Sequence, residues 1–169
     1  MKRLWLCAAF LLAGCGYHIA GTANALPPSI HSIAIPAFAN VTTQYKVSDL
    51  LAAAITRELI SRTNYHINAD PDHADAILTG AVVNFITYPT IFDPATGRAA
   101  GVQAVVTLQV TLRERASGKV LFTRPNMEVR ERYEISIDPK AYFDESEAAM
   151  QRLSRDVSRS VVSAVLENF

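Results

Sequence analysis

The chain contains few cysteines, no apolar run long enough to span a membrane, and no excess of either charge. Its two cysteines, Cys7 and Cys15, lie near the N-terminus, so residues 16–169 have neither a disulfide bond nor thiol chemistry. Sixteen basic residues balance sixteen acidic ones, which gives no reason to expect nucleic acid as a partner. The apolar run at residues 4–12 is far shorter than the roughly 20 residues of a spanning helix. Because residues 16–169 contain no cysteine, the stability of the domain comes from the packing of its side chains and not from disulfide bonds.

Motifs of common enzyme classes are also missing. The sequence has no G-x-S-x-G nucleophile elbow, no H-E-x-x-H pair and no phosphate-binding glycine loop. Asp70, Asp72, His73 and Asp75 lie close together in sequence, but their spacing matches no calcium or zinc loop. We interpret them as a solvated turn with side chain-to-backbone hydrogen bonds. We therefore predict a protein that is not an enzyme and holds no metal ion.

The N-terminus carries an export signal. Lys2 and Arg3 precede the apolar residues 4–12, and Leu-Ala-Gly-Cys follows at residues 12–15, as in a secretory signal peptide. This ending resembles the bacterial lipobox, which implies cleavage after residue 14 and acylation of Cys15. Three acyl chains would hold the protein on its membrane, because two already anchor stably. An ordinary signal peptide with an incidental cysteine is the alternative.

The chain divides into three parts. We expect residues 1–14 to be the cleaved signal peptide, residues 15–29 to be the lipidated cysteine and a tether that contains Pro27-Pro28, and residues 30–169 to form a single periplasmic domain. Gly16 stands where many inner-membrane lipoproteins carry aspartate, so the resemblance implies the outer membrane. We expect no cofactor except the covalent lipid on Cys15.

Two segments have the periodicity of amphipathic helices. In residues 47–62, apolar side chains recur every four residues, and the charged residues lie on other faces. A second helix follows residue 144, where one stripe is apolar and the arginines face away from it. The members of this stripe are Met150, Leu153, Val157, Val161, Val165 and Phe169.

Three longer segments have the pattern of strands. Residues 76–88 are apolar and β-branched, with Gly80 as a point of close approach. Residues 102–113 alternate strictly, and residues 119–135 follow the hairpin turn Ser117-Gly118. Residues 30–35 and 65–68 predict shorter strands. We therefore predict an α+β two-layer sandwich, with both amphipathic helices on one face of a mostly antiparallel sheet whose other face is wet and charged.

An ordered set of short segments resembles a known family. The segments are Cys-Gly-Tyr-His at residues 15–18, Leu-Pro at 26–27, Ile-Ala-Ile-Pro-Ala-Phe-Ala-Asn at 33–40 and Ala-Asp-Ala-Ile-Leu-Thr-Gly at 74–80. Together they resemble LptE, the outer-membrane lipopolysaccharide-assembly lipoproteins. The resemblance implies two helices on a four-stranded sheet, inserted as a plug in the lipopolysaccharide-translocating β-barrel LptD. It also implies that the protein helps the barrel to fold and contacts lipopolysaccharide.

Two cations are candidates for contact with the phosphates of lipid A. In an up-and-down meander, the loop that carries Arg98 and the connection that carries Lys140 share one end of the sheet, opposite the turn at Lys119. We predict that Arg98 and Lys140 converge and face phosphate, a group that arginine and lysine both recognise. The alternative is two independent loop cations. Most of the basic residues between 113 and 132 are interpreted as part of a solvated sheet face with cross-strand ion pairs.

An apolar surface is expected at the same end. Ile91 and Phe92 precede the loop of Arg98, and Tyr142 and Phe143 follow Lys140. Exposed apolar tips and aromatic anchors mark binding surfaces, so we predict partner contacts at these four residues. The alternative for Phe92 is that its ring folds back onto the core.

A second resemblance supports a different function. The strand at residues 33–38, followed by an amphipathic helix, resembles curli-type secretion lipoproteins, which implies an oligomeric scaffold. Those chains need additional membrane-crossing hairpins, and residues 15–169 leave little room for them. The size of the native assembly distinguishes a ring from a monomer or a one-to-one complex with a barrel.

Overall fold

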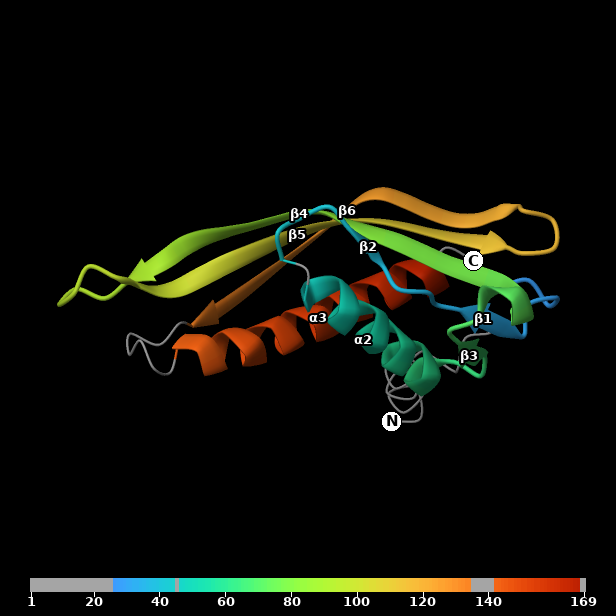
Figure 1. The fold of residues 1–169 in the computed structure, drawn as a ribbon, viewed down its shortest axis with the longest axis horizontal. Helices are drawn as coiled ribbons and strands as arrows, with labels where there is room; N and C mark the ends of the chain where they lie inside the picture. Colours follow the sequence, from blue (N-terminus) through green and yellow to red (C-terminus); the bar gives the residue numbers. More distant parts are fainter. Residues whose placement is uncertain (1–25, 45, 135–141, 168–169) are drawn as a thin grey trace, which may run out of the picture.

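The computed structural model describes residues 26–44, 46–134 and 142–167. Two helices, α2 (Lys46–Arg62) and α3 (Tyr142–Leu166), lie on one face of a sheet (Figure 1). The strands are β1 (Ser32–Ala34), β2 (Ala39–Asn40), β3 (His66–Asn68), β4 (Ala76–Phe92), β5 (Ala99–Glu114) and β6 (Val120–Glu134), with a short 3-10 helix, η1 (Pro71–His73), before β4. In this part of the chain, no helix is both long and apolar enough to cross a membrane. The α+β architecture with two helices is confirmed.

The sheet is mixed, with strand order β3-β1-β4-β5-β6, and β2 also pairs with β4. The long strands β4, β5 and β6 form the expected antiparallel meander. However, β1 pairs in parallel with both β3 and β4, and β2 pairs in parallel with β4. The prediction of a mostly antiparallel four-stranded sheet is therefore wrong in strand number and in the direction of the short strands. These strands contain two or three residues each, too few to show an alternating pattern.

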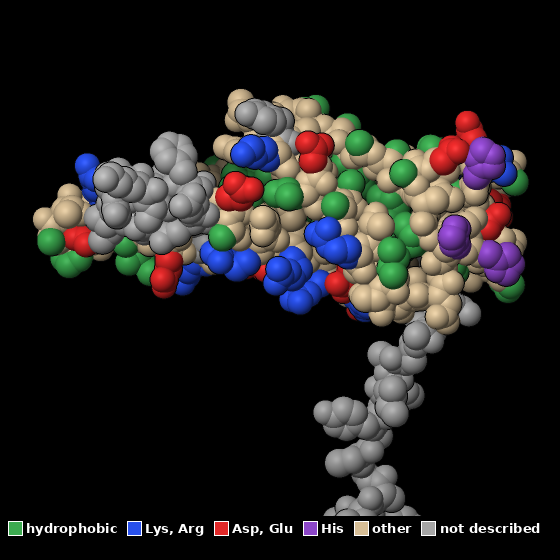
Figure 2. Space-filling view, turned by 60° about the horizontal axis from the view of Figure 1, so that its bottom comes forward, with side chains coloured by type: hydrophobic (Ala, Val, Ile, Leu, Met, Phe, Trp, Pro, Cys, Tyr) green, Lys and Arg blue, Asp and Glu red, His purple; other side chains and the backbone are tan. Residues whose placement is uncertain are grey.

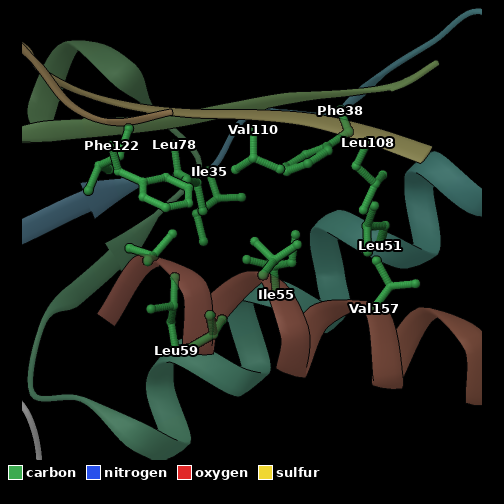
Figure 3. Packing of buried hydrophobic residues seen from close by; sticks show 14 of the residues in the cluster. Ile35, Phe38, Leu51, Ile55, Leu59, Leu78, Leu108, Val110, Phe122 and Val157 are labelled. Atoms are coloured by element: carbon green, nitrogen blue, oxygen red, sulfur yellow. The ribbon is translucent and has the colours of Figure 1, made fainter. Parts of the chain in front are cut away.

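The core lies between the sheet and the helices. Every second residue of β5 from Val102 to Leu112 is buried, and so are the predicted apolar stripes of both helices over their described residues, apart from the partly buried Leu50 and Met150. Figure 3 shows Leu78, Val110 and Leu108 of the sheet pointing toward the helices. Leu51, Ile55, Leu59 and Val157 point back from α2 and α3. Helix and strand periodicity thus placed the same residues in the core that the structure buries.

The ring of Phe38 packs closely against the backbone of Gly80 in this core. Phe38 is buried and lies in the segment between β1 and β2. A Cβ atom added to Gly80 of β4 would lie 2.1 Å from Cε1 of the Phe38 ring. The prediction of close approach at Gly80 is confirmed, because only a residue without a side chain leaves room for this ring.

Asp75 connects the start of β4 to the start of β1. Its Oδ2 atom accepts hydrogen bonds from the backbone nitrogens of His31 and Ser32 and from Ser32 Oγ, each at 2.9 Å. The His31 N–H, followed by the Ser32 hydroxyl, lowers the pKa of the Asp75 carboxyl. Nearby, the backbone nitrogen of the buried Leu26 donates to Tyr65 Oη at 3.1 Å. The segment that leads into β1 is therefore held by two independent sets of polar contacts.

Candidate functional site

The end of the β4–β5 hairpin carries exposed apolar side chains. We call residues 86–98 the β4–β5 tip. The exposed fractions are 38% for Ile86, 49% for Tyr88, 48% for Ile91 and 59% for Phe92. Figure 1 shows that the hairpin extends beyond the start of α3, so the helices leave its end uncovered. The Phe92 ring points to solvent and does not fold back onto the core.

Strand register places these apolar side chains on the face without helices. Ile86 lies opposite Val105, and Tyr88 lies opposite Gln103. Residues directly opposite each other share a face of the sheet. Ala104, between Val105 and Gln103, is fully buried on the helix side. The apolar row of β4 therefore continues the open face of the sheet toward the tip.

The turn of the tip is ordered by its own side chains. Oδ1 of Asp93 accepts hydrogen bonds from the backbone nitrogens of Ala95 at 2.7 Å and Thr96 at 2.8 Å. These bonds, first that from Thr96, lower the pKa of Asp93. Gly97 has a φ of +67°, in the left-handed region that favours glycine. Arg98 follows on this ordered turn and is exposed.

The convergence of Arg98 with Lys140 remains a prediction. Glu134, the last residue of β6, pairs with Gly101 near the start of β5, so β6 ends toward the β4–β5 tip. The helix α3 also begins at this end of the sheet (Figure 1). Lys140 and the side chains of Tyr142 and Phe143 lie outside the described residues.

Several arginines of the β5–β6 hairpin have structural partners. Arg113 Nη1 donates to the carbonyl oxygen of Gly118 at 2.7 Å, and Arg115 Nε donates to that of Ala74 at 2.6 Å. Arg130 Nε lies 2.6 Å from Oε1 of Glu128 on the same strand. All three arginines are exposed, but the expected cross-strand ion pairs are not what holds them. Arg113 and Arg115 bind backbone carbonyls, Arg115 lies in the turn after β5, and the ion pair of Arg130 runs along its own strand.

Glu131 differs from its neighbours because it lies on the helix side of β6. It pairs with the buried Ala104, and it is partly buried. Burial, followed by repulsion from Asp156 of α3, raises the pKa of the Glu131 carboxyl. The folded protein therefore holds a proton on Glu131 at pH values where the unfolded chain has released it.

We expect Glu131→Gln to stabilise the protein at pH 7 by about 0.5 kcal/mol, a small gain because the side chain is partly solvated. A raised pKa makes the folded state lose stability as pH rises above the ordinary value of 4.5. The gain should therefore vanish near pH 4. Urea unfolding at both pH values measures it, with the exposed Glu128→Gln as control. An equal gain at both pH values would contradict the assignment.

The acidic turn before β4 is organised by hydrogen bonds. Asp70 Oδ1 accepts from the backbone nitrogen of Asp72 at 3.0 Å, and Asp70 Oδ2 lies 2.6 Å from His73 Nδ1. This confirms the interpretation of a turn with side chain-to-backbone bonds. Among the described residues, no group of three or more histidine, cysteine or acidic side chains is placed to hold a metal ion.

One polar groove was not predicted. It lies between α2 and α3, has a volume of ≈ 490 Å³, and is lined by Arg57, Arg155 and Arg159 among others. The sequence identified the polar side of each helix from its own periodicity. It did not reveal that these two polar sides meet, because that depends on how the helices pack against each other.

Comparison with known proteins identifies the family. The family LptE, described as lipopolysaccharide-assembly, matches residues 30–165, which is most of the chain. No curated protein matches the chain significantly in sequence. Two of the segments that resembled LptE, residues 33–40 and 74–80, lie inside this match, which extends from the first strand to the last turns of α3, whereas residues 15–18 and 26–27 precede it.

Solved structures share the fold at low sequence identity. The rare lipoprotein B of Shewanella oneidensis is 14% identical, with a TM-score of 0.50 over 80% of this chain and 94% of that one. The PelC dodecamer from Paraburkholderia phytofirmans is 15% identical, with a TM-score of 0.52 over 85% of this chain and 92% of that one. By the family match over residues 30–165, the chain belongs to the LptE lipopolysaccharide-assembly family.

Proposed function

We propose that the protein is an outer-membrane lipoprotein, anchored through Cys15, that binds and plugs the translocation barrel LptD. It helps the barrel to assemble and takes part in the delivery of lipopolysaccharide to the outer leaflet. The family match over residues 30–165 carries the proposal. The Leu-Ala-Gly-Cys ending of the signal peptide supports the lipid anchor and the periplasmic location of the domain.

The surface of the domain has features that are suited to binding. The helices cover one face of the sheet (Figure 1). The other face carries polar and charged side chains and leads to the apolar β4–β5 tip. Exposed apolar patches rimmed by polar residues mark interaction sites. The open face can contact a surrounding wall, and the tip can contact the amphipathic lipopolysaccharide.

Co-purification from outer membranes tests the proposal. The full chain is expressed with its own signal in a diderm host and isolated in detergent, and the native mass of its complex is measured. We expect a large β-barrel at one-to-one stoichiometry. The same fold occurs in a dodecamer, PelC, so the fold does not fix the assembly. A homo-oligomeric ring, or the protein alone, would contradict the proposal and support the secretion scaffold.

The proposed lipid anchor has its own test. The substitution Cys15→Ala removes the acylation site, so the variant protein is expected to leave the membrane fraction.

We expect Arg98→Glu to weaken lipopolysaccharide binding about tenfold, because the change replaces an exposed cation on an ordered turn with an anion. Lys140→Glu should have a similar effect if both cations face one phosphate region. Lys119→Glu is the matched control, since Lys119 is an exposed cation next to the turn at the opposite end of the sheet. Binding to immobilised lipopolysaccharide measures the effect, and an equal loss in all three variants would contradict a localised site.

A further inference from the structure

Arginines from both helices surround the groove between α2 and α3. Arg57 of α2 faces the groove from one side, and Arg155 and Arg159 of α3 face it from the other. Figure 2, which views the helix side of the domain, shows basic side chains gathered along this face. Among the described residues, Glu58 is the one acidic side chain that lines the groove. The lining therefore has a net positive charge.

Two of these arginines are not neutralised. Glu58 Oε1 lies 3.5 Å from Nη1 of Arg62, which is outside the lining, and Arg159 has an acidic partner on its own helix. In the described part of the chain, neither Arg57 nor Arg155 forms an ion pair. Like charges that face one another across a groove repel, and an anion between them would remove that repulsion.

A buried hydroxyl group supplies an independent observation. Ser154 lines the same groove and is only 2% exposed, and its Oγ atom has no hydrogen-bond partner. The neighbouring Ser158 shows the usual arrangement, because its Oγ donates to the carbonyl oxygen of Arg155 at 2.7 Å. A buried hydroxyl without a partner is unfavourable. The Ser154 hydroxyl would gain a hydrogen-bond partner by donating to an acceptor bound in the groove.

We propose that the groove between α2 and α3 binds a phosphate ester. Phosphate matches the planar fork of a guanidinium group and accepts several hydrogen bonds at once. The groove volume of ≈ 490 Å³ lies in the range of small-molecule sites and exceeds what a bare phosphate ion requires. This inference depends on the proposed function only for the identity of the molecule that carries the phosphate.

Calorimetric titration of the full lipidated chain in an uncharged detergent tests the proposal. The probes are inorganic phosphate, glucosamine 1-phosphate and dihexanoyl phosphatidylglycerol, with glucosamine as the uncharged control. We expect the phosphorylated probes to bind and glucosamine not to bind. The double variant Arg57→Ala/Arg155→Ala should weaken binding at least tenfold. Arg152→Ala, an exposed arginine of α3 outside the groove lining, should change it less than twofold.

Two further comparisons sharpen the result. Preference for glucosamine 1-phosphate indicates a sugar phosphate as in lipopolysaccharide, preference for phosphatidylglycerol indicates a phospholipid, and equal affinity with inorganic phosphate indicates free phosphate. Ser154→Ala should weaken binding about threefold while the urea midpoint of the unliganded protein stays the same or rises. A purely structural Ser154 would instead lower the midpoint and leave binding unchanged.

The outcomes of this test are separable from those of the proposed function. Absence of binding by every phosphorylated probe, or an equal loss in Arg152→Ala, would overturn the groove site even if the barrel co-purifies. Binding that depends on Arg57 and Arg155 would support the groove site even if no barrel co-purifies.

Discussion

Gly80→Ala is expected to lower the free energy of unfolding by about 3 kcal/mol, at the upper end of the usual cost of overpacking. The added Cβ would overlap the Phe38 ring, because it would lie 2.1 Å from Cε1. Phe38 is buried and has little room to withdraw. Urea unfolding of the full chain measures the change.

A second substitution identifies the cause. Phe38→Leu shortens the side chain that meets Gly80, so the double variant should lose less stability than the sum of the single variants, by at least about 1 kcal/mol. Gly118→Ala is the control: its φ is +70° and no atom lies within 4 Å of the added Cβ, so it should cost about 1–2 kcal/mol from backbone strain alone. Phe38→Leu should not relieve that strain, and strictly additive losses at residues 38 and 80 would refute the packing argument.

Asp75→Ala is expected to cost about 3 kcal/mol. The change removes an acceptor that receives three hydrogen bonds from His31 and Ser32, and it leaves the partly buried backbone N–H and hydroxyl of Ser32 without this partner. Asp72→Ala is the control, since Asp72 is exposed on η1. Comparable losses in both variants would show that general turn stability, and not the link to β1, explains the result.

The contribution of Asp75 should also depend on pH. Its pKa in the folded protein lies below the ordinary value of 3.8, so the folded state binds the proton less readily than the unfolded chain. The stabilisation is therefore fully present above that ordinary value and is lost as pH falls through the folded pKa. Asp75→Asn should consequently differ most from the wild type near neutral pH. A stability difference that persists unchanged in strong acid would contradict this linkage.

Periodicity was sufficient to predict the helices and the long strands. The segment at residues 47–62 became α2 almost without change, and residues 102–113 form the centre of β5. The alternation of apolar and polar residues that begins at Val102 predicts burial, because every second side chain of the strand lies on the face covered by the helices. The close approach at Gly80 was also predicted correctly, because a glycine within an apolar strand often marks a site where another group contacts the backbone.

Pairing between distant segments could not be predicted in the same way. The strand β1 contains three residues and lies between β3 and β4, both remote in sequence. The candidate binding surfaces also divide into features that local sequence can predict and features that depend on the packing of distant segments. The local sequence predicted an apolar tip at Ile91 and Phe92 but left open whether the Phe92 ring folds back, whereas the groove of Arg57 and Arg155 exists only because two helices pack together.

The position of β1 determines how the domain carries mechanical load. The N-terminal segment enters the sheet between two strands, not at an edge, and Asp75 clamps its first residues. Removal of β1 from the sheet by a pull on the N-terminus therefore requires its pairing with both β3 and β4 to break. The anchor proposed at Cys15 would therefore apply its load at the start of β4, at the end of the sheet opposite the β4–β5 tip.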